Sequence, residues 1–206
     1  MADRLLTAVD RALKTLTTEP VGCRDSPARG IQEPNLSDTE RRQSAALLRV
    51  NHAGEVAAQA LYEGQRAVAR TPDLARHFQR AAAEERDHLT WCEERLKELD
   101  GRTSALGPLW YAGAYTMGLL AGTVSDQTSL GFVRETERQV VEHLHDHLNR
   151  LPPRDTKSAG ILETMAEDEA HHGRQAADAG ANELPMPVRL LMKAGGGFLR
   201  RVAFWV

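Results

Sequence analysis

The sequence predicts an all-α protein in which two helix hairpins form a four-helix bundle, flanked by further amphipathic helical segments. Alanine is abundant and aromatic residues make up only 5% of the 206 residues, a balance that favours helix over sheet. Apolar residues recur three and four positions apart along several long stretches. Helix-start and helix-stop residues separate these stretches, so the elements can be assigned in order.

The first 36 residues are predicted to be an amphipathic arm and a linker. Apolar residues at helical spacing indicate a short N-terminal helix; they are Leu5, Leu6, Val9, Leu13 and Leu16. Residues 20–34 contain proline, glycine, aspartate and asparagine with little apolar periodicity, which is typical of a loop. No function is assigned to this part of the chain.

Four long helices are predicted within residues 37–206. Ser37 followed by Glu40 forms a capping box at the start of the first, and the pair Thr71-Pro72 starts the second. Asp100-Gly101 and a proline pair at 152–153 provide stops. The helices are expected at about 37–70, 71–99, 126–151 and 155–179, with a last helical segment at 185–206.

Two segments, at about 104–125 and 188–206, are predicted to meet a membrane surface. The first has no charged residue over 22 positions, but its glycines, proline and aromatic residues fit an interface better than a span. The second mixes large apolar residues with arginine and lysine, as interfacial helices near anionic lipid do. The alternative is that both segments simply pack on the bundle. The predicted membrane contacts are Trp110, Tyr111, Tyr115, Phe198, Phe204 and Trp205.

Charge and cysteine content restrict the class of protein. The net charge of −3 argues against a nucleic-acid binder, so no nucleic-acid partner is expected. Two cysteines in a chain of this length are expected to be reduced thiols rather than a disulfide framework. The first residues carry no signal-peptide pattern.

Four glutamates interrupt apolar helical stripes. Glu85 shares its face with apolar residues and, one turn on, with His88. Glu84 and Glu135 instead lie on polar faces, so Glu85 and Glu137 are the better candidates for burial. Glu169 repeats the pattern with His172, whereas Glu55 lies on a face that is only moderately apolar.

Buried carboxylates need compensating cations. Two divalent metals would balance four glutamates, and oxygen-rich ligands with one imidazole per metal suit iron or manganese. Glu55 and Glu137 are 82 residues apart, and Glu85 and Glu169 are 84 apart, as expected for a duplicated hairpin. Two lone glutamates with two Glu-x-x-His pairs is the pattern of ferritin-like carboxylate proteins. The sequence therefore predicts a dinuclear site in a ferritin-like four-helix bundle.

Other residues are candidates for supporting this site. His52 lies one turn before Glu55 and could orient its carboxylate, and His143 follows Glu137 by six residues. Tyr62 is expected in the core, with a role beside the metals as the alternative. His147, near the end of a polar helix, is expected to be exposed.

Three functions remain open on these residues: an oxygen-activating enzyme, a ferritin-like iron-binding or ferroxidase protein, and a structural bundle. The segment 48–55 (LRVNHAGE), Tyr62 with Gly64-Gln65, and the segment 84–89 (EERDHL) resemble the demethoxyubiquinone hydroxylase family. Residues 108–110 (PLW) and 168–172 (DEAHH) are also similar to it, and the resemblance runs from about residue 47 to the C-terminus.

This resemblance implies a di-iron monooxygenase that uses O2 to hydroxylate the ring of a demethoxy polyprenyl benzoquinol, late in ubiquinone biosynthesis. It also implies a peripheral protein on the cytoplasmic face of a bacterial-type cell membrane, with other ubiquinone-biosynthesis proteins as further partners. Glu85 and Glu169 would bridge two iron ions. The implied ligands are Glu55, Glu85, His88, Glu137, Glu169 and His172.

Overall fold

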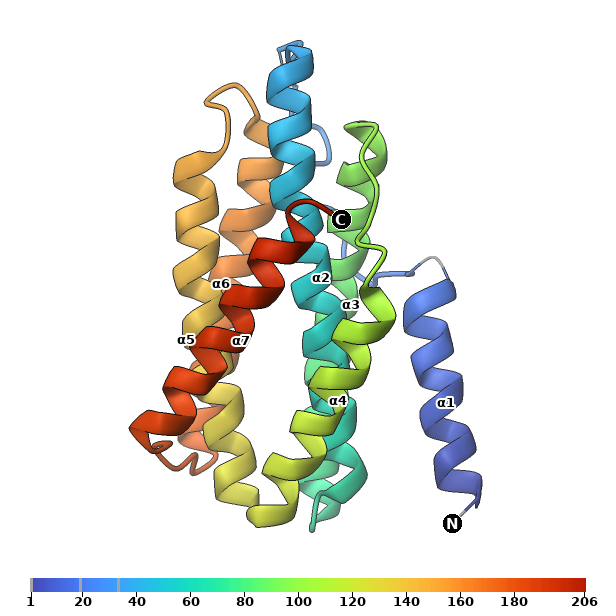
Figure 1. The fold of residues 1–206 in the computed structure, drawn as a ribbon, viewed down its shortest axis with the longest axis vertical. Coiled ribbons are helices and arrows are strands. Elements are labelled where there is room, and N and C mark those ends of the chain that lie inside the picture. The colour runs from blue at the N-terminus through green and yellow to red at the C-terminus, as the bar shows by residue number, and fades with distance from the viewer. Residues whose placement is uncertain (1, 19, 33) are drawn as a thin grey trace.

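The computed structural model describes residues 2–18, 20–32 and 34–206, with side chains from residue 10 onward. All regular structure in these residues is helical, in line with the predicted all-α class (Figure 1). The predicted apolar face at Leu5, Leu6 and Val9 lies outside the described side chains. The helices are α1 (Ala2–Thr17), α2 (Asp38–Val68), α3 (Pro72–Glu98), α4 (Gly107–Val124), α5 (Asp126–Arg150), α6 (Thr156–Asp178) and α7 (Met186–Ala203).

The bundle consists of the hairpins α2–α3 and α5–α6, and contacts of α3 with α6 and of α2 with α5 join them. The predicted helix starts are present. Ser37 Oγ accepts a hydrogen bond from the Glu40 amide at 3.4 Å, while the Glu40 carboxylate accepts one from the Ser37 amide at 2.7 Å. Thr71 caps α3 through the Leu74 amide at 3.2 Å.

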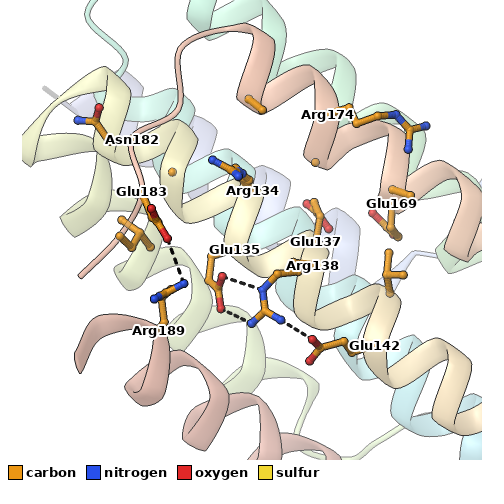
Figure 2. A pocket seen from close by; sticks show the side chains of 16 residues that line it. Arg134, Glu135, Glu137, Arg138, Glu142, Glu169, Arg174, Asn182, Glu183 and Arg189 are labelled. Carbon is orange, nitrogen blue, oxygen red and sulfur yellow. Dashed lines mark hydrogen bonds and ion pairs between the residues drawn. The ribbon is translucent and has the colours of Figure 1, made fainter. Parts of the chain in front are cut away.

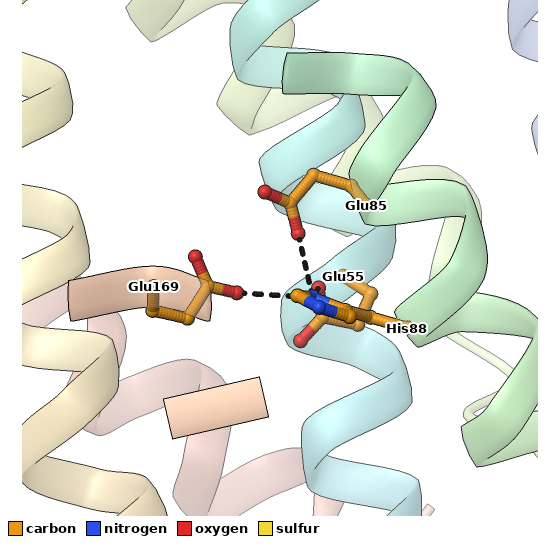
Figure 3. A group of neighbouring side chains, drawn as sticks. All are labelled: Glu55, Glu85, His88 and Glu169. Carbon is orange, nitrogen blue, oxygen red and sulfur yellow. Dashed lines mark hydrogen bonds and ion pairs between the residues drawn. The ribbon is translucent and has the colours of Figure 1, made fainter. Parts of the chain in front are cut away.

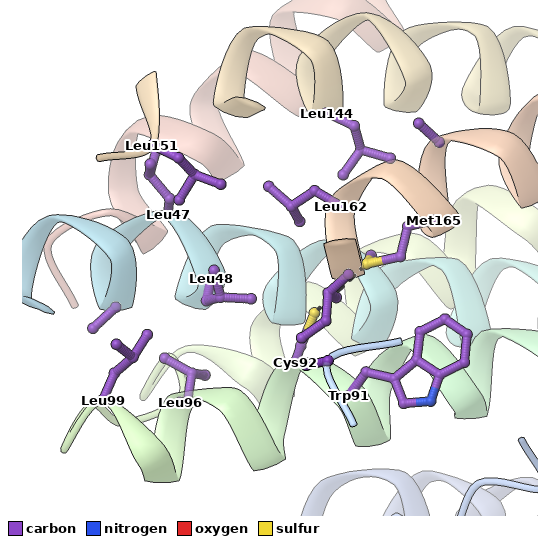
Figure 4. Packing of buried hydrophobic residues seen from close by; sticks show 14 residues of the cluster. Leu47, Leu48, Trp91, Cys92, Leu96, Leu99, Leu144, Leu151, Leu162 and Met165 are labelled. Carbon is purple, nitrogen blue, oxygen red and sulfur yellow. Dashed lines mark hydrogen bonds between the residues drawn. The ribbon is translucent and has the colours of Figure 1, made fainter. Parts of the chain in front are cut away.

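Two apolar clusters fill the bundle and leave a polar layer between them. On α3, Phe78 belongs to one cluster, with Tyr62 and Leu130. Trp91 and Leu96, farther along α3, belong to the other, with leucines and Met165 from the remaining bundle helices (Figure 4). The predicted metal ligands on α3 fall between the two clusters, so they are enclosed on both sides by packed apolar side chains.

The segment at 104–125 forms α4, which packs along α2 rather than standing free. Gly118 and Gly64 permit a close approach, because a Cβ on Gly118 would lie 2.2 Å from the Leu61 carbonyl oxygen and one on Gly64 would lie 2.3 Å from that of Tyr115. None of the described helices has the length and apolar content needed to span a membrane.

The burial of two aromatic residues on α4 corrects a prediction. Trp110 is only 7% exposed and Tyr111 only 6%, so they cannot serve as membrane contacts in this arrangement. Trp110 donates to Ser104 Oγ at 3.2 Å and packs edge-on against Phe198, while Tyr115 is half-buried. A single sequence marks aromatic residues as suited to an interface, but it does not say which face of α4 meets α2.

Replacing Gly118 by alanine is expected to destabilise the protein by about 1–3 kcal/mol, because the new methyl group would meet backbone rather than a movable side chain. For a chain of this size that is a fall in Tm of roughly 2–10 °C. Gly113 lies on the same helix with no atom within 4 Å of an added Cβ, so Gly113→Ala is the matched control. Thermal melts that gave the same Tm for both variants would contradict this account of the α2–α4 contact.

α7 runs obliquely across the bundle and contacts both α2 and α5 (Figure 1). Its exposed large apolar residues are Met186, Leu190, Leu191 and Phe198, followed beyond the helix by Trp205 and Val206. Phe204 is half-buried over Arg150, whose guanidinium carbon lies 5.7 Å from the ring centroid. α1 packs beside α2 and α4, where Arg11 pairs with Glu63 at 2.6 Å.

Candidate metal centre

All six predicted ligands converge in the polar layer of the bundle. α2 and α5 each contribute one glutamate, and α3 and α6 each contribute a glutamate and a histidine one turn apart. All six are buried. Two overlapping groups have ligand atoms within 4.8 Å of one another: the first is Glu55, Glu85, His88 and Glu169, and the second is Glu85, Glu137, Glu169 and His172.

Glu85 and Glu169 belong to both groups and connect them. Glu85 Oε2 lies 3.1 Å from His88 Nδ1, while its Oε1 lies 3.2 Å from His172 Nδ1. Glu169 repeats this. Its Oε1 lies 3.2 Å from His88 Nδ1 (Figure 3), and its Oε2 lies 3.1 Å from His172 Nδ1. Each carboxylate therefore presents one oxygen to each imidazole, which is the arrangement needed to bridge two adjacent cations.

The outer glutamates complete one group each. Glu55 Oε2 lies 3.7 Å from His88 Nδ1. Glu137 accepts a hydrogen bond from the Tyr62 hydroxyl at 2.5 Å through Oε1, which leaves Oε2 free of this bond. Tyr62 is thus both a core residue and a partner of the site.

The buried glutamates of the polar layer need positive charge nearby to remain ionised. Burial and neighbouring carboxylates raise the pKa of Glu55 and Glu137 well above the ordinary glutamate value. Burial would lower the pKa of His88, but hydrogen bonds to Asp168 and the surrounding glutamates raise it well above the ordinary value.

The donor set fits metal ions on this evidence. Glu55 Oε2 and Glu85 Oε1 are enclosed, and the imidazole nitrogens nearest to them are hydrogen-bonded to other carboxylate oxygens, so neither oxygen accepts a hydrogen bond from a residue that the structure describes. Enclosed carboxylate oxygens without donors are costly unless a cation is near. Four carboxylates and two imidazoles match two divalent ions in charge, and this set suits iron or manganese.

The supporting histidines behave differently from one another. His52 is buried, which lowers its pKa to about 4, but no hydrogen bond joins it to Glu55 in the described part of the chain. His143 Nδ1 is enclosed without a hydrogen-bond partner, and burial lowers the pKa of this residue to about 3. His147 is buried and hydrogen-bonded to Asn51 at 2.9 Å, so the prediction that it is exposed was wrong. Its face of α5 is turned toward α2, which the polar residues around it do not reveal.

Sequence reasoning missed a reciprocal pair of contacts. The acidic residue directly before Glu85 or Glu169 contacts the histidine of the opposite hairpin: Asp168 lies 2.9 Å from His88 Nε2, and Glu84 lies 2.6 Å from His172 Nε2. The available signal was the acidic residue directly before both Glu-x-x-His pairs. Glu84 lies on a polar face and its side chain is 48% exposed, yet it also contacts a histidine of the site.

Glu135 and Glu137 are both buried, so they differ in the direction of their side chains and not in burial. Glu135 points away from the site and pairs with Arg138 at 2.7 Å. It lines a cavity of about 510 Å³ between α5 and α6 that reaches Glu137 and Glu169 (Figure 2). Four arginines also line this cavity: Arg134, Arg138, Arg174 and Arg189.

Fold and site together define a class: an all-α bundle protein with a buried carboxylate–imidazole centre suited to metal ions. The family described as "Ubiquinone biosynthesis protein COQ7" matches residues 42–203. A 3-demethoxyubiquinol 3-hydroxylase of Paracidovorax citrulli is 51% identical over 98% of both chains. Proteins of the same name from Variovorax paradoxus and Nitrosococcus oceani are 52% and 49% identical, over 98% and 99% of this chain and 96% of each relative. The chain belongs to this family, and it is an enzyme of the hydroxylase type.

Proposed function

We propose that the chain is a di-iron monooxygenase that hydroxylates the ring of a demethoxy polyprenyl benzoquinol with O2. The observation that carries this proposal is the pair of carboxylates, Glu85 and Glu169, that each face both imidazoles. The relatives' shared name, 3-demethoxyubiquinol 3-hydroxylase, supports the substrate. The family of the chain and its hydroxylase relatives favour this function over iron storage or ferroxidase activity.

The residues of the site would have three different roles: binding metal, orienting a ligand and excluding water. The six predicted ligands would hold two iron ions. In the ferrous state these would supply two electrons, so that O2 and two protons give one oxygen atom in a ring C–OH group and one molecule of water. Tyr62 fixes one oxygen of Glu137 and thereby directs the other toward the metal position. The apolar clusters on both sides exclude bulk water from the reacting groups.

The cavity beside Glu137 and Glu169 is the proposed place for the benzoquinol ring. Its volume of about 510 Å³ falls in the range of small-molecule sites. Arg189 of α7 lies at its rim, and the exposed Leu190 and Leu191 follow directly. An isoprenoid tail leaving the cavity at this point would meet the apolar side of α7 and the lipid beyond it.

The exposed apolar residues of α4 and α7 support membrane contact. Leu109, Met117 and Leu120 are exposed on α4, and the apolar residues of α7 alternate with arginines that suit anionic lipid. We propose peripheral binding on the cytoplasmic face of a bacterial-type cell membrane, where other ubiquinone-biosynthesis proteins would be partners. Phe198 and Trp205 remain candidate contacts, because both are exposed.

Changing Leu190, Leu191 and Trp205 together to serine is expected to weaken binding to anionic vesicles at least about tenfold. Full burial of a large apolar side chain away from water contributes roughly 1.5–3 kcal/mol, and each replacement removes part of this contribution to membrane binding. Sedimentation with liposomes measures the partition. Val21 is equally exposed but lies in the linker, so Val21→Ser is the control. Equal partition of the triple variant and the control would overturn the role of α7.

A quinone extract from a strain lacking this chain tests the proposed function. Accumulation of the demethoxy-quinone, reversed by the wild-type chain, is the expected result. A normal quinone profile with disturbed cellular iron would instead favour the ferroxidase alternative.

A further inference from the structure

Arg24 of the N-terminal linker lies directly outside the metal centre. Its Nε donates to Asp87 Oδ2 at 2.8 Å, and its Nη2 donates to Asp168 Oδ2 at 2.8 Å. The same Asp168 oxygen lies 2.9 Å from His88 Nε2. Arg24 Nη2 itself lies 3.4 Å from that nitrogen, but it cannot donate to it while the nitrogen carries a hydrogen, so the hydrogen-bonded link runs through Asp168. One guanidinium therefore joins α3 to α6 through two carboxylates, and one of these carboxylates holds a predicted metal ligand.

The linker is itself fixed at this point. The Cys23 amide donates to Asp87 Oδ1 at 2.5 Å, and the Trp91 indole donates to the Arg24 carbonyl at 3.3 Å. The Arg24 guanidinium carbon lies 4.7 Å from the centroid of the Trp91 ring. Gly22 allows this approach, because a Cβ there would lie 2.8 Å from Asp87 Oδ1. Arg24 is thus held on several sides although its side chain is 42% exposed.

The two halves of the centre differ in this respect. His88 is held by Asp168, whose own position is fixed by Arg24. His172 is held by Glu84, which is about half exposed and forms no ion pair with an arginine among the described residues; the charge of Arg24 acts on it only at longer range. Of the two carboxylates that contact the histidines, Asp168 is therefore fixed by an ion pair with Arg24, whereas Glu84 is not.

We propose that Arg24 is a positioning residue that holds Asp168 against His88 and thereby makes the metal position of Glu55 and His88 the tighter of the two. This inference rests on the proposed metal centre. It gives the linker a function, whereas the sequence assigned none.

Asp168 would strengthen metal binding because it selects the tautomer of His88. Ionised Asp168 accepts but does not donate, so it favours the neutral tautomer with the hydrogen on His88 Nε2, which would leave Nδ1, the nitrogen that faces Glu85 and Glu169, to bind a metal. Partners that fix a ligating histidine in this way typically change metal affinity 10–100-fold. Arginine suits the task because its planar fork can bind two carboxylates at once, which the point charge of lysine does less well.

The experiment is an anaerobic Fe²⁺ titration of the full chain, with Mössbauer spectra of the ⁵⁷Fe-loaded protein. The wild type is expected to bind two ions, the first more tightly. Arg24→Ala is expected to weaken the tighter position about tenfold and Asp168→Ala by 10–100-fold, with one of the two iron signals altered. Arg24→Lys should restore part of the affinity.

Two controls separate positioning from folding. Arg29 lies in the same linker and pairs only with the exposed Asp25 among the described residues, so Arg29→Ala should stay within about twofold of the wild type. In the double variant, Arg24→Ala should add no further loss to Asp168→Ala, because Arg24 acts through Asp168. Thermal melts of the metal-free proteins identify any variant that loses its fold. If Arg24→Ala does so, Arg24→Lys is compared with the wild type in its place.

The outcomes are distinct. Two ions bound with wild-type affinities and unchanged spectra in folded Arg24 variants would overturn the inference but leave the metal centre intact. An additional loss in the double variant would also overturn it, because Arg24 would then act by another route. A wild-type chain that binds no pair of ions would overturn the proposed function itself.

Discussion

Replacing Glu85 by alanine is expected to abolish paired metal binding and to reduce hydroxylation at least about 1,000-fold, which corresponds to about 4 kcal/mol of lost transition-state stabilisation. Glu85 is fully buried and presents one oxygen to His88 and the other to His172, so its loss affects both metal positions at once. Iron content per chain and turnover of a demethoxy-benzoquinol measure the two effects.

Glu94 provides the matched control for Glu85. It lies on the same helix, is exposed, and belongs to neither ligand group. Glu94→Ala should keep two ions and full activity. If Glu85→Ala retained paired iron and turnover at the level of this control, the assignment of the bridging carboxylate would be wrong.

Replacing Asp155 by alanine is expected to destabilise the fold by about 3–5 kcal/mol, or roughly 6–20 °C in Tm. Asp155 caps α6 by accepting from the Ser158 amide at 2.9 Å, and it pairs with the buried Arg95 at 2.7 Å. Arg95 also contacts Ser158 Oγ and Glu98, so the network ties α3 to the start of α6. Removing its carboxylate leaves a buried guanidinium with less compensation.

The effect should depend on pH in a defined direction. Burial would raise the pKa of Asp155, but hydrogen bonds and the charge of Arg95 lower it below the ordinary value of 3.8. The carboxylate therefore stabilises the fold above that value, and the contribution is lost as the pH falls through the lowered pKa. Denaturant unfolding should show a difference between wild type and Asp155→Ala that shrinks in acid.

Asp146 serves as the control for Asp155. It pairs with Arg150 on the exposed surface of α5 at 3.1 Å, so Asp146→Ala should change stability by no more than about 0.5 kcal/mol. A loss as small for Asp155→Ala would show that the buried pair contributes little.

The helical pattern was sufficient to predict that Glu85, Glu137 and Glu169 are buried, because each of them interrupts an apolar stripe. The core clusters on α3 show why this works: Phe78 and Leu96 must face inward, and the residues between them on the same face must do so too. The capping residues Ser37 and Thr71 likewise placed two helix starts correctly.

Contacts between elements could not be predicted in the same way. His147 and Trp110 are buried because α5 meets α2 and α4 meets α2 at faces that periodicity in one segment does not identify. Arg24 lies 144 residues from Asp168 in sequence, and nothing in the linker's composition indicates that pairing. Local patterns gave the buried faces, whereas the partners of the site depend on tertiary packing.

The most direct test of the proposed function is a single-turnover reaction of the chain, loaded anaerobically with Fe²⁺ and demethoxy-benzoquinol and then exposed to ¹⁸O₂. Mass spectrometry of the extracted quinone measures the label. The account predicts one ¹⁸O atom in the ring product, at a yield that rises with iron up to two ions per chain. Oxidation of the iron with unlabelled or unchanged quinone would contradict it.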